Sequence, residues 1–213
     1  VAFRFPGRKQ LIHNISLSIQ KGEIVALMGE NGSGKSTISQ IIQKHYQAEA
    51  GQITINCNTP LSEISLSSCR KLISVVPQNV HIFNGTVLEN IAFDDAFINT
   101  QKVLLFINQI GFAPFIDCLP QSYSTLVGEE GINLSGGQKQ IIAIARALYH
   151  KPQFLILDEA TSAMDKQSEK HILNMLVQLK KEMGILFITH KLHILKSLCD
   201  KIYILENGVI STS

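Results

Sequence analysis

The chain has 213 residues, of which 45% are hydrophobic and 17% are charged, and its 19 basic and 17 acidic side chains leave a formal net charge of +2. This composition is typical of one large globular domain or two small ones, and it argues against disorder and against nucleic-acid binding driven by bulk positive charge. The longest apolar runs, such as 141–145, are far shorter than the ~18 residues of a membrane-spanning helix, which excludes a span in this chain.

Short apolar runs separated by turns fill the N-terminal third of the chain and predict β-strands. These runs cover residues 1–5, 15–19, 23–28, 53–55 and 73–76. The run at 23–28 is almost continuously apolar, as expected for a strand that is buried on both faces. A glycine-rich loop follows it, and a helical pattern then extends from Lys35 to about Lys44.

Helical periodicity dominates the middle of the chain, and strand patterns return after it. The expected helices cover residues 87–92, 100–110, 135–150 and 165–181, and the expected later strands cover 154–157, 185–189 and 202–205. Alternation of strands and helices predicts an α/β fold in which crossover helices connect a parallel sheet. The helices of the middle third look like an insertion into that fold.

The four cysteines, Cys57, Cys69, Cys118 and Cys199, form no C-x-x-C pair, so neither a zinc site nor a redox motif is indicated. No long apolar segment follows the basic residues at the start of the chain, so no signal peptide is indicated. We therefore expect reduced cysteines in a cytosolic environment.

The segment from Gly29 to Thr37 fits the pattern G-x-x-x-x-G-K-[ST], with a strand before it and a helix after it, and is called the phosphate loop below. Its candidate nucleotide-binding residues are Gly29, Glu30, Asn31, Gly32, Ser33, Gly34, Lys35, Ser36 and Thr37. Glycines let successive N–H groups point at phosphate oxygens, and the following helix adds its positive end. Lys35 should reach the β- and γ-phosphates, and the Ser36 hydroxyl should bind Mg²⁺. A glycine-rich turn without a ligand is the alternative, which the strand–loop–helix context disfavours.

Two carboxylates, Asp158 and Glu159, follow the apolar run at 154–157. The carboxyl ends of parallel strands are where such folds bind ligands, so Asp158 can hold Mg²⁺ through water and Glu159 can orient or deprotonate an attacking water. His190 closes the next strand and is expected to contact the γ-phosphate. The simpler alternatives are a solvated acidic pair and a capping or surface histidine. Beside a complete phosphate loop, they are the weaker interpretations.

Residues 134–138 read Leu-Ser-Gly-Gly-Gln and open a long expected helix. This stretch, the signature segment, resembles the signature of the ABC (ATP-binding cassette) ATPases, and further motifs follow in that family's order along nearly the whole chain. They are an adenine-stacking aromatic (Phe5), the Walker A loop with Lys35, a Q-loop glutamine (Gln78), Walker B carboxylates (Asp158 and Glu159), a D-loop (Ser162 to Asp165) and a switch histidine (His190).

The resemblance implies a P-loop NTPase core with a mainly parallel sheet, an antiparallel β portion at the N-terminus and an inserted helical subdomain. We expect residues 1–78 and 151–213 to form the nucleotide-binding core and residues 79–150 the helical subdomain. ATP would be the substrate and Mg²⁺ the cofactor. The implied metal-binding residues are Ser36, Gln78 and Asp158, and the implied catalytic residues are Glu159, His190 and Gln78.

In this family the signature segment packs against ATP held by a second protomer, arranged head to tail. The resemblance therefore assigns Leu134, Ser135, Gly136, Gly137 and Gln138 to a site completed in trans. Ser135 and the Gly137 N–H would complete the cage around the γ-phosphate at a helix start. Asp165 would connect the two sites across the dimer. The implied reaction is phosphoryl transfer to water by positioning and charge stabilisation.

Three positions depart from the usual family pattern. Phe5 stands where Tyr is commoner, Met164 replaces a frequent Leu, and Ile141 stands where many members carry Arg. Stacking on Phe5 should survive without the hydroxyl, and the Met164 exchange is conservative. None of the three removes a catalytic group, so the site is expected to be active.

The stretch from Pro77 to Ile91 resembles the segment that receives coupling helices of the membrane domain in exporters, and Val127–Gly131 resembles the exporter X-loop. A helix-capping loop and an acidic turn are the simpler alternatives. The Phe-Asn-Gly-Thr version of the first stretch, at 83–86, resembles exporters of peptides and bacteriocins. We thus expect the ATPase motor of an exporter at the cytoplasmic face of the cell membrane, with peptide cargo as the favoured subtype.

Both ends of the chain look like those of a domain excised from a longer half-transporter with its membrane domain upstream. Intact catalytic groups favour an ATP-dependent homodimer with two equivalent sites, and no nucleic-acid partner is expected. The main alternative is a soluble ABC ATPase that acts in translation or in chromosome and repair processes. A regulatory module that binds ATP without turnover is a third possibility, against which Glu159 argues.

Overall fold

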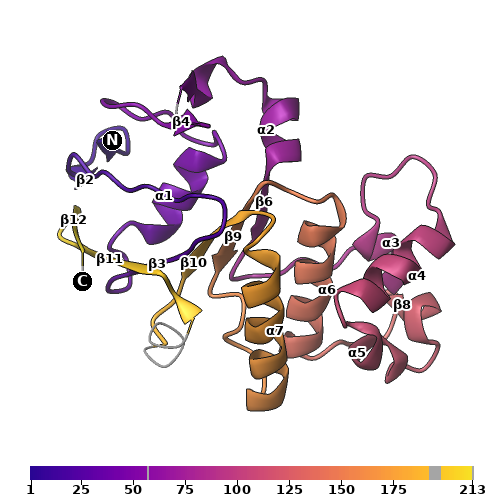
Figure 1. The fold of residues 1–213 in the computed structure, drawn as a ribbon. Coiled ribbons are helices and arrows are strands. Elements are labelled where there is room, and N and C mark those ends of the chain that lie inside the picture. Colours follow the sequence, from indigo (N-terminus) through magenta and orange to yellow (C-terminus); the bar gives the residue numbers. More distant parts are fainter. Residues whose placement is uncertain (57, 192–197, 213) are drawn as a thin grey trace. The chain divides into compact units, whose positions relative to one another are not determined.

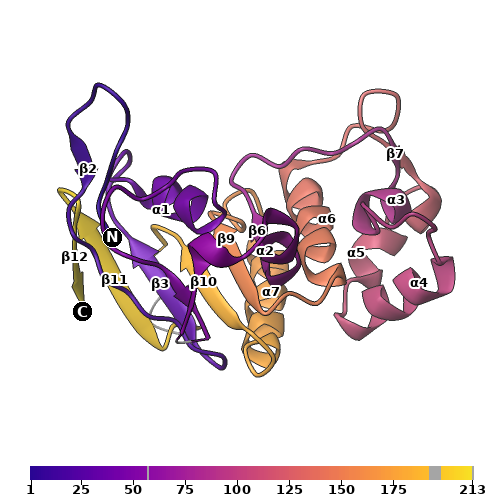
Figure 2. The ribbon, with the colours of Figure 1, turned by 90° about the horizontal axis from the view of Figure 1, so that it is seen from above.

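The computed structural model describes residues 1–56, 58–191 and 198–212 of the chain, which Figures 1 and 2 show in two views. The chain folds into two compact units. The first comprises residues 1–74, 153–159 and 180–213, and the second comprises 75–152 and 160–179. No helix in the described part of the chain has both the length and the apolar character needed to cross a membrane.

The main sheet has six strands in the order β12-β11-β3-β10-β9-β6 (Figure 2). Their bounds are β3 Ile24–Met28, β6 Ile73–Val76, β9 Phe154–Asp158, β10 Gly184–Ile188, β11 Lys201–Glu206 and β12 Val209–Thr212. Strands β9, β10, β3 and β11 pair in parallel, whereas β12 runs antiparallel to β11. The side chains of β3, β9 and β10 are almost all buried, which explains their near-continuous apolar sequences. The predicted α/β fold with a mainly parallel sheet is confirmed.

Shorter elements complete the first unit. Helix α1 (Lys35–Ile42) packs against β9, and η1 (Leu61–Glu63) and α2 (Leu66–Leu72) precede β6. Two small antiparallel sheets pair β1 (Phe3–Arg4) with β2 (Gln10–Ile12) and β4 (Thr54–Ile55) with β5 (Thr59–Pro60). The antiparallel β portion expected at the N-terminus is therefore present.

The strand predicted at 15–19 is wrong. Ile15 is buried and its alternation with polar neighbours is real, but its N–H donates to the carbonyl oxygen of Val1 (2.8 Å) and that of Ser18 donates to the hydroxyl of Tyr203 (3.3 Å). Asn14, immediately before this stretch, has a left-handed φ of 47°. The backbone is thus held by scattered contacts instead of a ladder, although the side chains keep a period of two.

The second unit is mainly helical. Its elements are β7 Gly85–Thr86, α3 Val87–Ile91, α4 Thr100–Gln109, α5 Ala113–Asp117, η2 Ser122–Ser124, β8 Leu126–Val127, α6 Gly136–Tyr149 and α7 Lys166–Leu179. The short strands β7 and β8 pair antiparallel. Thr86 and Glu89 form a capping box at the start of α3, in which each side chain accepts a hydrogen bond from the other residue's backbone N–H. The helices expected at 87–92, 100–110, 135–150 and 165–181 are confirmed within two residues at each end.

Arg146 of α6 fastens this helix to the segment around α3. Its guanidinium donates to the carbonyl oxygen of Asn90 (2.7 Å), to the Asn90 side chain (2.7 Å) and to the carbonyl oxygen of His81 (3.0 Å). The same group lies over the Phe83 ring, 4.9 Å from its centroid. Burial lowers the pKa of Arg146, yet the multiple acceptors satisfy its charge. α6 and the residues after β6 therefore form one packed body.

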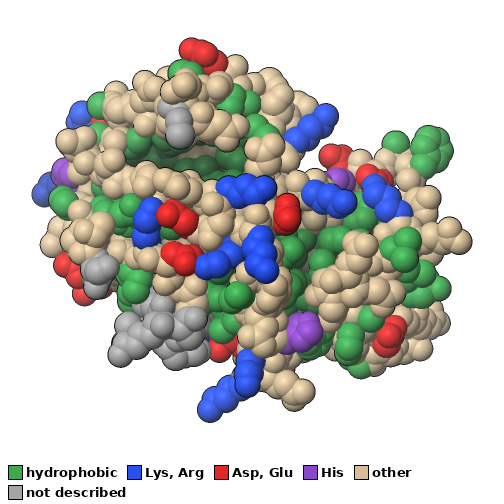
Figure 3. Space-filling model, in the orientation of Figure 1, with side chains coloured by type: hydrophobic (Ala, Val, Ile, Leu, Met, Phe, Trp, Pro, Cys, Tyr) green, Lys and Arg blue, Asp and Glu red, His purple; other side chains and the backbone are tan. Residues whose placement is uncertain are grey.

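Basic and acidic side chains are interspersed on the face that Figure 3 shows, as the near-neutral net charge suggests. Three cysteines are free thiols: Cys69 is buried, Cys199 is half-buried and Cys118 is exposed. Cys57 lies outside the described residues.

Candidate functional site

The phosphate loop connects the end of β3 to the start of α1, as predicted. Gly29 and Gly34 have φ values of 150° and 108°, a region that side chains other than glycine rarely adopt. A Cβ atom on Gly29 would also collide with the carbonyl oxygen of Leu205 in β11. These glycines let the chain turn sharply at the carboxyl edge of the sheet and enter α1 at Lys35.

Lys35 is held inside this loop. Its side chain is only 8% exposed, and Nζ donates to the carbonyl oxygens of Gly29 (2.8 Å) and Glu30 (2.7 Å). Ser33 Oγ is buried and has no hydrogen-bond partner in the described residues. A buried ammonium, an unsatisfied hydroxyl and the N-terminus of α1 together form a lining that suits an anion such as a phosphate group.

Asp158 ends β9 as a buried carboxylate, and the Ser36 side chain is near enough to affect its pKa. Burial raises the pKa of Asp158, the Ser36 side chain opposes that effect, and the Glu159 charge adds to it. A hydroxyl and a carboxylate oxygen are suitable ligands for Mg²⁺. The described residues contain no cluster of three or more His, Cys, Asp or Glu side chains that could hold a metal ion. A magnesium ion here would need phosphate and water oxygens as well, which is how Mg²⁺ binds with nucleotides.

Glu159 and His190 meet at the ends of adjacent parallel strands. Asp158 pairs with Ile188 in the register of β9 and β10, so the residues that follow these strands emerge side by side. Glu159 has a left-handed φ of 49°, and its N–H donates to the Ile188 carbonyl oxygen (2.9 Å). The side chains then approach, with His190 Nδ1 3.1 Å from Glu159 Oε1. Glu159 is 14% exposed and His190 is 65% exposed, so the pair opens toward solvent.

Phe5 lies directly after β1 in the first unit and is partly exposed. Its ring forms edge-to-face contacts with Phe3 (centroids 5.0 Å apart) and Tyr46 (5.3 Å). Tyr46 was not among the residues that the sequence motifs identified. No sequence motif marks Tyr46, which lies a few residues after α1. Its contact with Phe5 is visible only in the folded structure.

The signature segment begins α6 in the second unit. Ser135 Oγ accepts the Gln138 N–H (3.2 Å) and the Gln138 side chain accepts the Ser135 N–H (2.8 Å), so the two residues form a capping box. Ser135 is exposed and Gln138 is half-buried, whereas Leu134 is buried. The exposed backbone N–H groups of a long helix are therefore available at this end.

Close packing ties the signature segment to the predicted D-loop in the same unit. A Cβ on Gly136 would lie 2.8 Å from the Ala163 Cβ, so glycine permits this approach. Gln140, which is 3% exposed, donates to Ser162 Oγ (3.1 Å) and accepts from the Ala163 N–H (3.2 Å). Gln140 was not identified from the sequence, because its role depends on this tertiary contact.

Asp165 caps the start of α7. Its carboxylate accepts the N–H groups of Gln167 and Ser168 (2.9 Å each) and the Ser168 hydroxyl (2.6 Å). Hydrogen bonds from Ser168 lower the pKa of Asp165. The observed contacts thus give Asp165 a capping function, and its expected contribution across a dimer stays a prediction.

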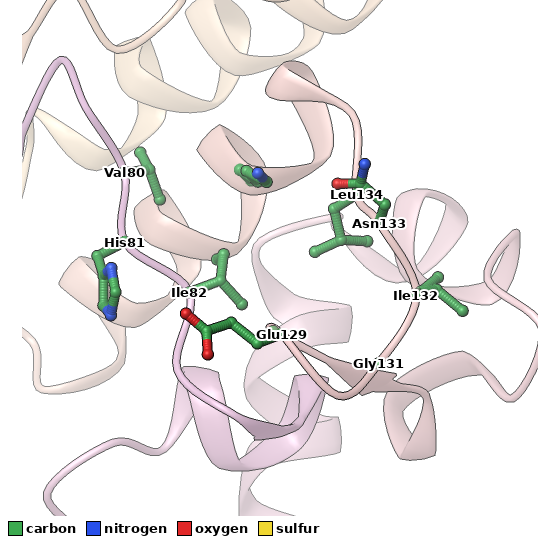
Figure 4. Close-up of a pocket in the computed structure, with 10 residues that line it drawn as sticks. Val80, His81, Ile82, Glu129, Gly131, Ile132, Asn133 and Leu134 are labelled. Atoms are coloured by element: carbon green, nitrogen blue, oxygen red, sulfur yellow. The ribbon is translucent and has the colours of Figure 1, made fainter.

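Gln78 follows β6 in the second unit and is exposed. Just beyond it lies a cavity of about 470 Å³, bordered by Val80–Ile82 on one side and Gly131–Leu134 on the other. Ile82 and Leu134 point into the space between the two segments in Figure 4, and Glu129 lies at its edge. This pocket is lined by residues from or next to the two stretches that resemble exporter motifs, 77–91 and 127–131.

A family model described as ABC transporter matches residues 12–162. The chain belongs to the ABC transporter family. The ATP-dependent lipid A-core flippase of Haemophilus influenzae (strain 86-028NP) is 40% identical over 99% of this chain and 36% of its own length. The flippase of the same name from Salmonella paratyphi A is 41% identical, again over 99% of this chain and 36% of its own. The chain thus spans little more than a third of these curated relatives.

A solved structure gives the same result. The chain superimposes on a bacterial Atm1-family ABC exporter with ATP bound, with a TM-score of 0.90 and 34% sequence identity, over 99% of this chain and 37% of the exporter chain. Within the ABC transporter family, the segment corresponds to the ATPase domain. A soluble ABC ATPase of translation or repair is not favoured, because the matched relatives are transporters.

Proposed function

We propose that this domain binds ATP with Mg²⁺ and hydrolyses it to drive an ABC exporter. The supporting observation is the convergence, at one edge of a parallel sheet, of a buried lysine in a phosphate loop, a buried carboxylate and a carboxylate–imidazole pair. In this proposal residues 1–78 and 151–213 form the nucleotide-binding core, and residues 79–150 form the helical subdomain.

The phosphate loop, residues Gly29–Thr37, would bind the triphosphate, and Phe5 would stack on the adenine. Ser36 and Asp158, with Gln78, would hold Mg²⁺, which when bound neutralises charge on the phosphate oxygens. Ser36 and Asp158 already lie close enough for the Ser36 side chain to lower the pKa of the carboxyl group. Lys35 would exchange the carbonyl oxygens of its loop for the phosphate oxygens of the nucleotide.

Glu159 would orient or deprotonate the attacking water at its carboxylate, and His190 would contact the γ-phosphate. The 3.1 Å contact between them restrains the Glu159 side chain, whose carboxylate is a suitable general base. Gln78 would help to position the same water. Chemistry of this kind needs alignment of the nucleophile and stabilisation of charge, and little covalent participation by the protein.

The signature segment, Leu134–Gln138, would complete the site of a second copy arranged head to tail. Its supporting features are an exposed, capped helix start at Ser135 and two glycines that leave the backbone N–H groups uncovered. Asp165, held beside this segment through Gln140 and the D-loop, would then lie at the dimer interface. ATP between the two half-sites stabilises the dimer, and its hydrolysis releases it.

A transmembrane domain is the second proposed partner, and the cytoplasmic face of the membrane the proposed location. The matched relatives are nearly three times longer than this chain, and the pocket between Val80–Ile82 and Gly131–Leu134 offers a recess with a mixed polar and apolar lining that includes Glu129 and Lys139. Such a recess can receive a short helix of a membrane domain.

The cargo is a lipid or a peptide. The matched relatives are lipid A-core flippases, which supports a lipid. The peptide hypothesis rests only on the Phe83–Thr86 sequence, and none of these relatives supports it. ATPase stimulation in the complete transporter, reconstituted in nanodiscs with lipid A or with peptide, separates the two.

Substitution of Glu159 tests the ATPase proposal most directly. We expect Glu159→Gln to lower phosphate release by roughly 10²–10⁴-fold, the usual contribution of a general base, while ATP binding persists. The variant should also shift to a dimer in size-exclusion chromatography with MgATP. Glu182→Gln, which removes an exposed carboxylate paired loosely with Lys21 at 3.9 Å, is the matched control. Wild-type turnover by Glu159→Gln would refute the assignment.

A further inference from the structure

Phe5, near the N-terminus of the domain, packs against two other aromatic rings. Its ring meets the Phe3 ring at an interplanar angle of 83° and the Tyr46 ring at 87°, and the Phe3 and Tyr46 centroids are 5.5 Å apart. The three rings form a compact aromatic triad. Phe3 is 4% exposed and anchors the triad in the core, whereas Tyr46 is 40% exposed. Both contacts of Phe5 are edge-to-face, so neither neighbour is stacked in parallel on its ring.

The segment that carries Tyr46 is attached beside β1 through its last two residues, Glu49 and Ala50. The Ala2 N–H donates to the Ala50 carbonyl oxygen (2.8 Å), and the Glu49 N–H donates to the Ala2 carbonyl oxygen (2.9 Å). The Arg4 guanidinium adds an ion pair to Glu49 (2.7 Å). That pair is exposed and contributes little stability, so the backbone hydrogen bonds are the main attachment. They fix the position of the Tyr46 segment against the strand that leads into Phe5.

The other end of the same segment leads back to the phosphate loop. Helix α1 begins at Lys35 and ends at Ile42, and Lys44 leaves it with a left-handed φ of 62°. The Lys44 ammonium donates to the carbonyl oxygens of Ile64 (2.5 Å) and Ser62 (3.2 Å), which fixes this turn. A single short stretch of chain, held by the Lys44 hydrogen bonds, therefore connects the phosphate-binding residues to the ring that touches Phe5.

We propose that Tyr46 is a positioning residue that holds the Phe5 ring in place for stacking on the nucleotide base. The inference rests on the proposed ATP binding and deepens it, because it divides binding into two parts. Phosphate contacts come from the loop at the start of α1. Base contact depends on Phe5, whose orientation is set by Tyr46 on one side and Phe3 on the other. Tyr46 itself does not touch the nucleotide.

The test compares Tyr46→Leu with Tyr46→Phe in the 213-residue chain, by calorimetry with MgATP and with magnesium tripolyphosphate, which lacks base and sugar. Tyr46→Leu should weaken ATP binding roughly two- to tenfold, the range expected for one aromatic contact, and leave tripolyphosphate binding unchanged. Tyr46→Phe keeps the ring and should retain wild-type affinity for both. Thermal denaturation of each variant verifies folding, which the exposure of Tyr46 favours.

A double substitution separates positioning from a general structural role. A Phe5→Leu background lacks the ring proposed to stack on the base, so adding Tyr46→Leu should have no further effect on ATP affinity. Equal losses for ATP and tripolyphosphate, additive losses in the double variant, or wild-type ATP affinity of Tyr46→Leu would each overturn the inference. Failure of the wild-type chain to bind ATP would instead overturn the proposed function, so the two failures are distinguishable.

Discussion

His190 Nδ1 lies 3.1 Å from Glu159 Oε1, at the point where two adjacent parallel strands end. The contact links the residue proposed to act on water with the residue proposed to meet the γ-phosphate. A backbone hydrogen bond from Glu159 to Ile188 holds the same corner together (2.9 Å). The orientation of the glutamate therefore depends on β10 as much as on its own strand.

Removal of the imidazole should slow hydrolysis without preventing ATP binding. His190→Ala takes away the partner of Glu159 and one contact to the developing charge, and by analogy with other lost charge-stabilising donors we expect a decrease in kcat of about 10²-fold. Steady-state phosphate release and ATP calorimetry measure the two effects. His13→Ala, which removes another exposed imidazole of the first unit, serves as control. Retention of full activity by His190→Ala would show that the contact is dispensable.

Loss of the loop lysine should act mainly on affinity. Lys35 is buried with its charge directed at loop carbonyl oxygens, and a hydrogen bond to a charged group contributes ~1.5–3 kcal/mol, so Lys35→Ala should weaken ATP binding by roughly tenfold or more. Lys71→Ala on α2 makes the same change at an exposed site. Unchanged nucleotide affinity in Lys35→Ala, measured by calorimetry, would contradict the phosphate-loop assignment.

A bulky charged side chain at the signature segment should prevent ATP-dependent dimerisation without preventing ATP binding by the monomer. Ser135→Arg places a cation at the exposed start of α6 and removes the capping hydroxyl, at a cost of about 1 kcal/mol in stability. We expect monomers that still bind ATP but do not form the ATP-dependent dimer, even in a Glu159→Gln background. Multi-angle light scattering reports the mass of the species formed.

The matched control for this experiment is Ser67→Arg, the same change at an exposed position of α2 outside the signature segment. It should dimerise normally. If Ser135→Arg instead abolished ATP binding by the monomer, the proposal that Ser135 acts on the nucleotide of a partner copy would be wrong.

Site residues that belong to contiguous sequence motifs were predicted, whereas residues that meet only through tertiary packing were not. The phosphate loop and the Asp158–Glu159 pair each occupy one short stretch at a strand end, so a local pattern fixes their chemistry and their edge of the sheet. The Tyr46–Phe5 contact depends on how distant segments of the chain pack. So does the Gln140–Ser162 hydrogen bond, which joins residues 22 positions apart. No local pattern marks such residues.

The strands, too, were predicted correctly where the local sequence determines them and wrongly where a pairing partner is needed. Buried parallel strands such as β3 and β10 were predicted within one residue because they are continuously apolar. The stretch at 15–19 has the alternation of a strand, yet no strand in the described part of the chain offers it a ladder, and the N–H groups of Ile15 and Ser18 donate to separate acceptors. Side-chain periodicity predicts which face is buried, whereas strand pairing depends on the partner as well.

The cysteines should differ sharply in alkylation. Burial raises the pKa of Cys69, and burial together with the Asp200 charge raises the pKa of Cys199 to about 11. Because only the thiolate reacts, a thiol with a pKa near 11 is ~0.1% ionised at pH 8. Cys118 is exposed. A short iodoacetamide pulse at pH 8, read by peptide mass spectrometry, should label Cys118 and spare Cys69 and Cys199. The same pulse in denaturant should label all three, and equal labelling of Cys199 and Cys118 in the native protein would contradict the burial of Cys199.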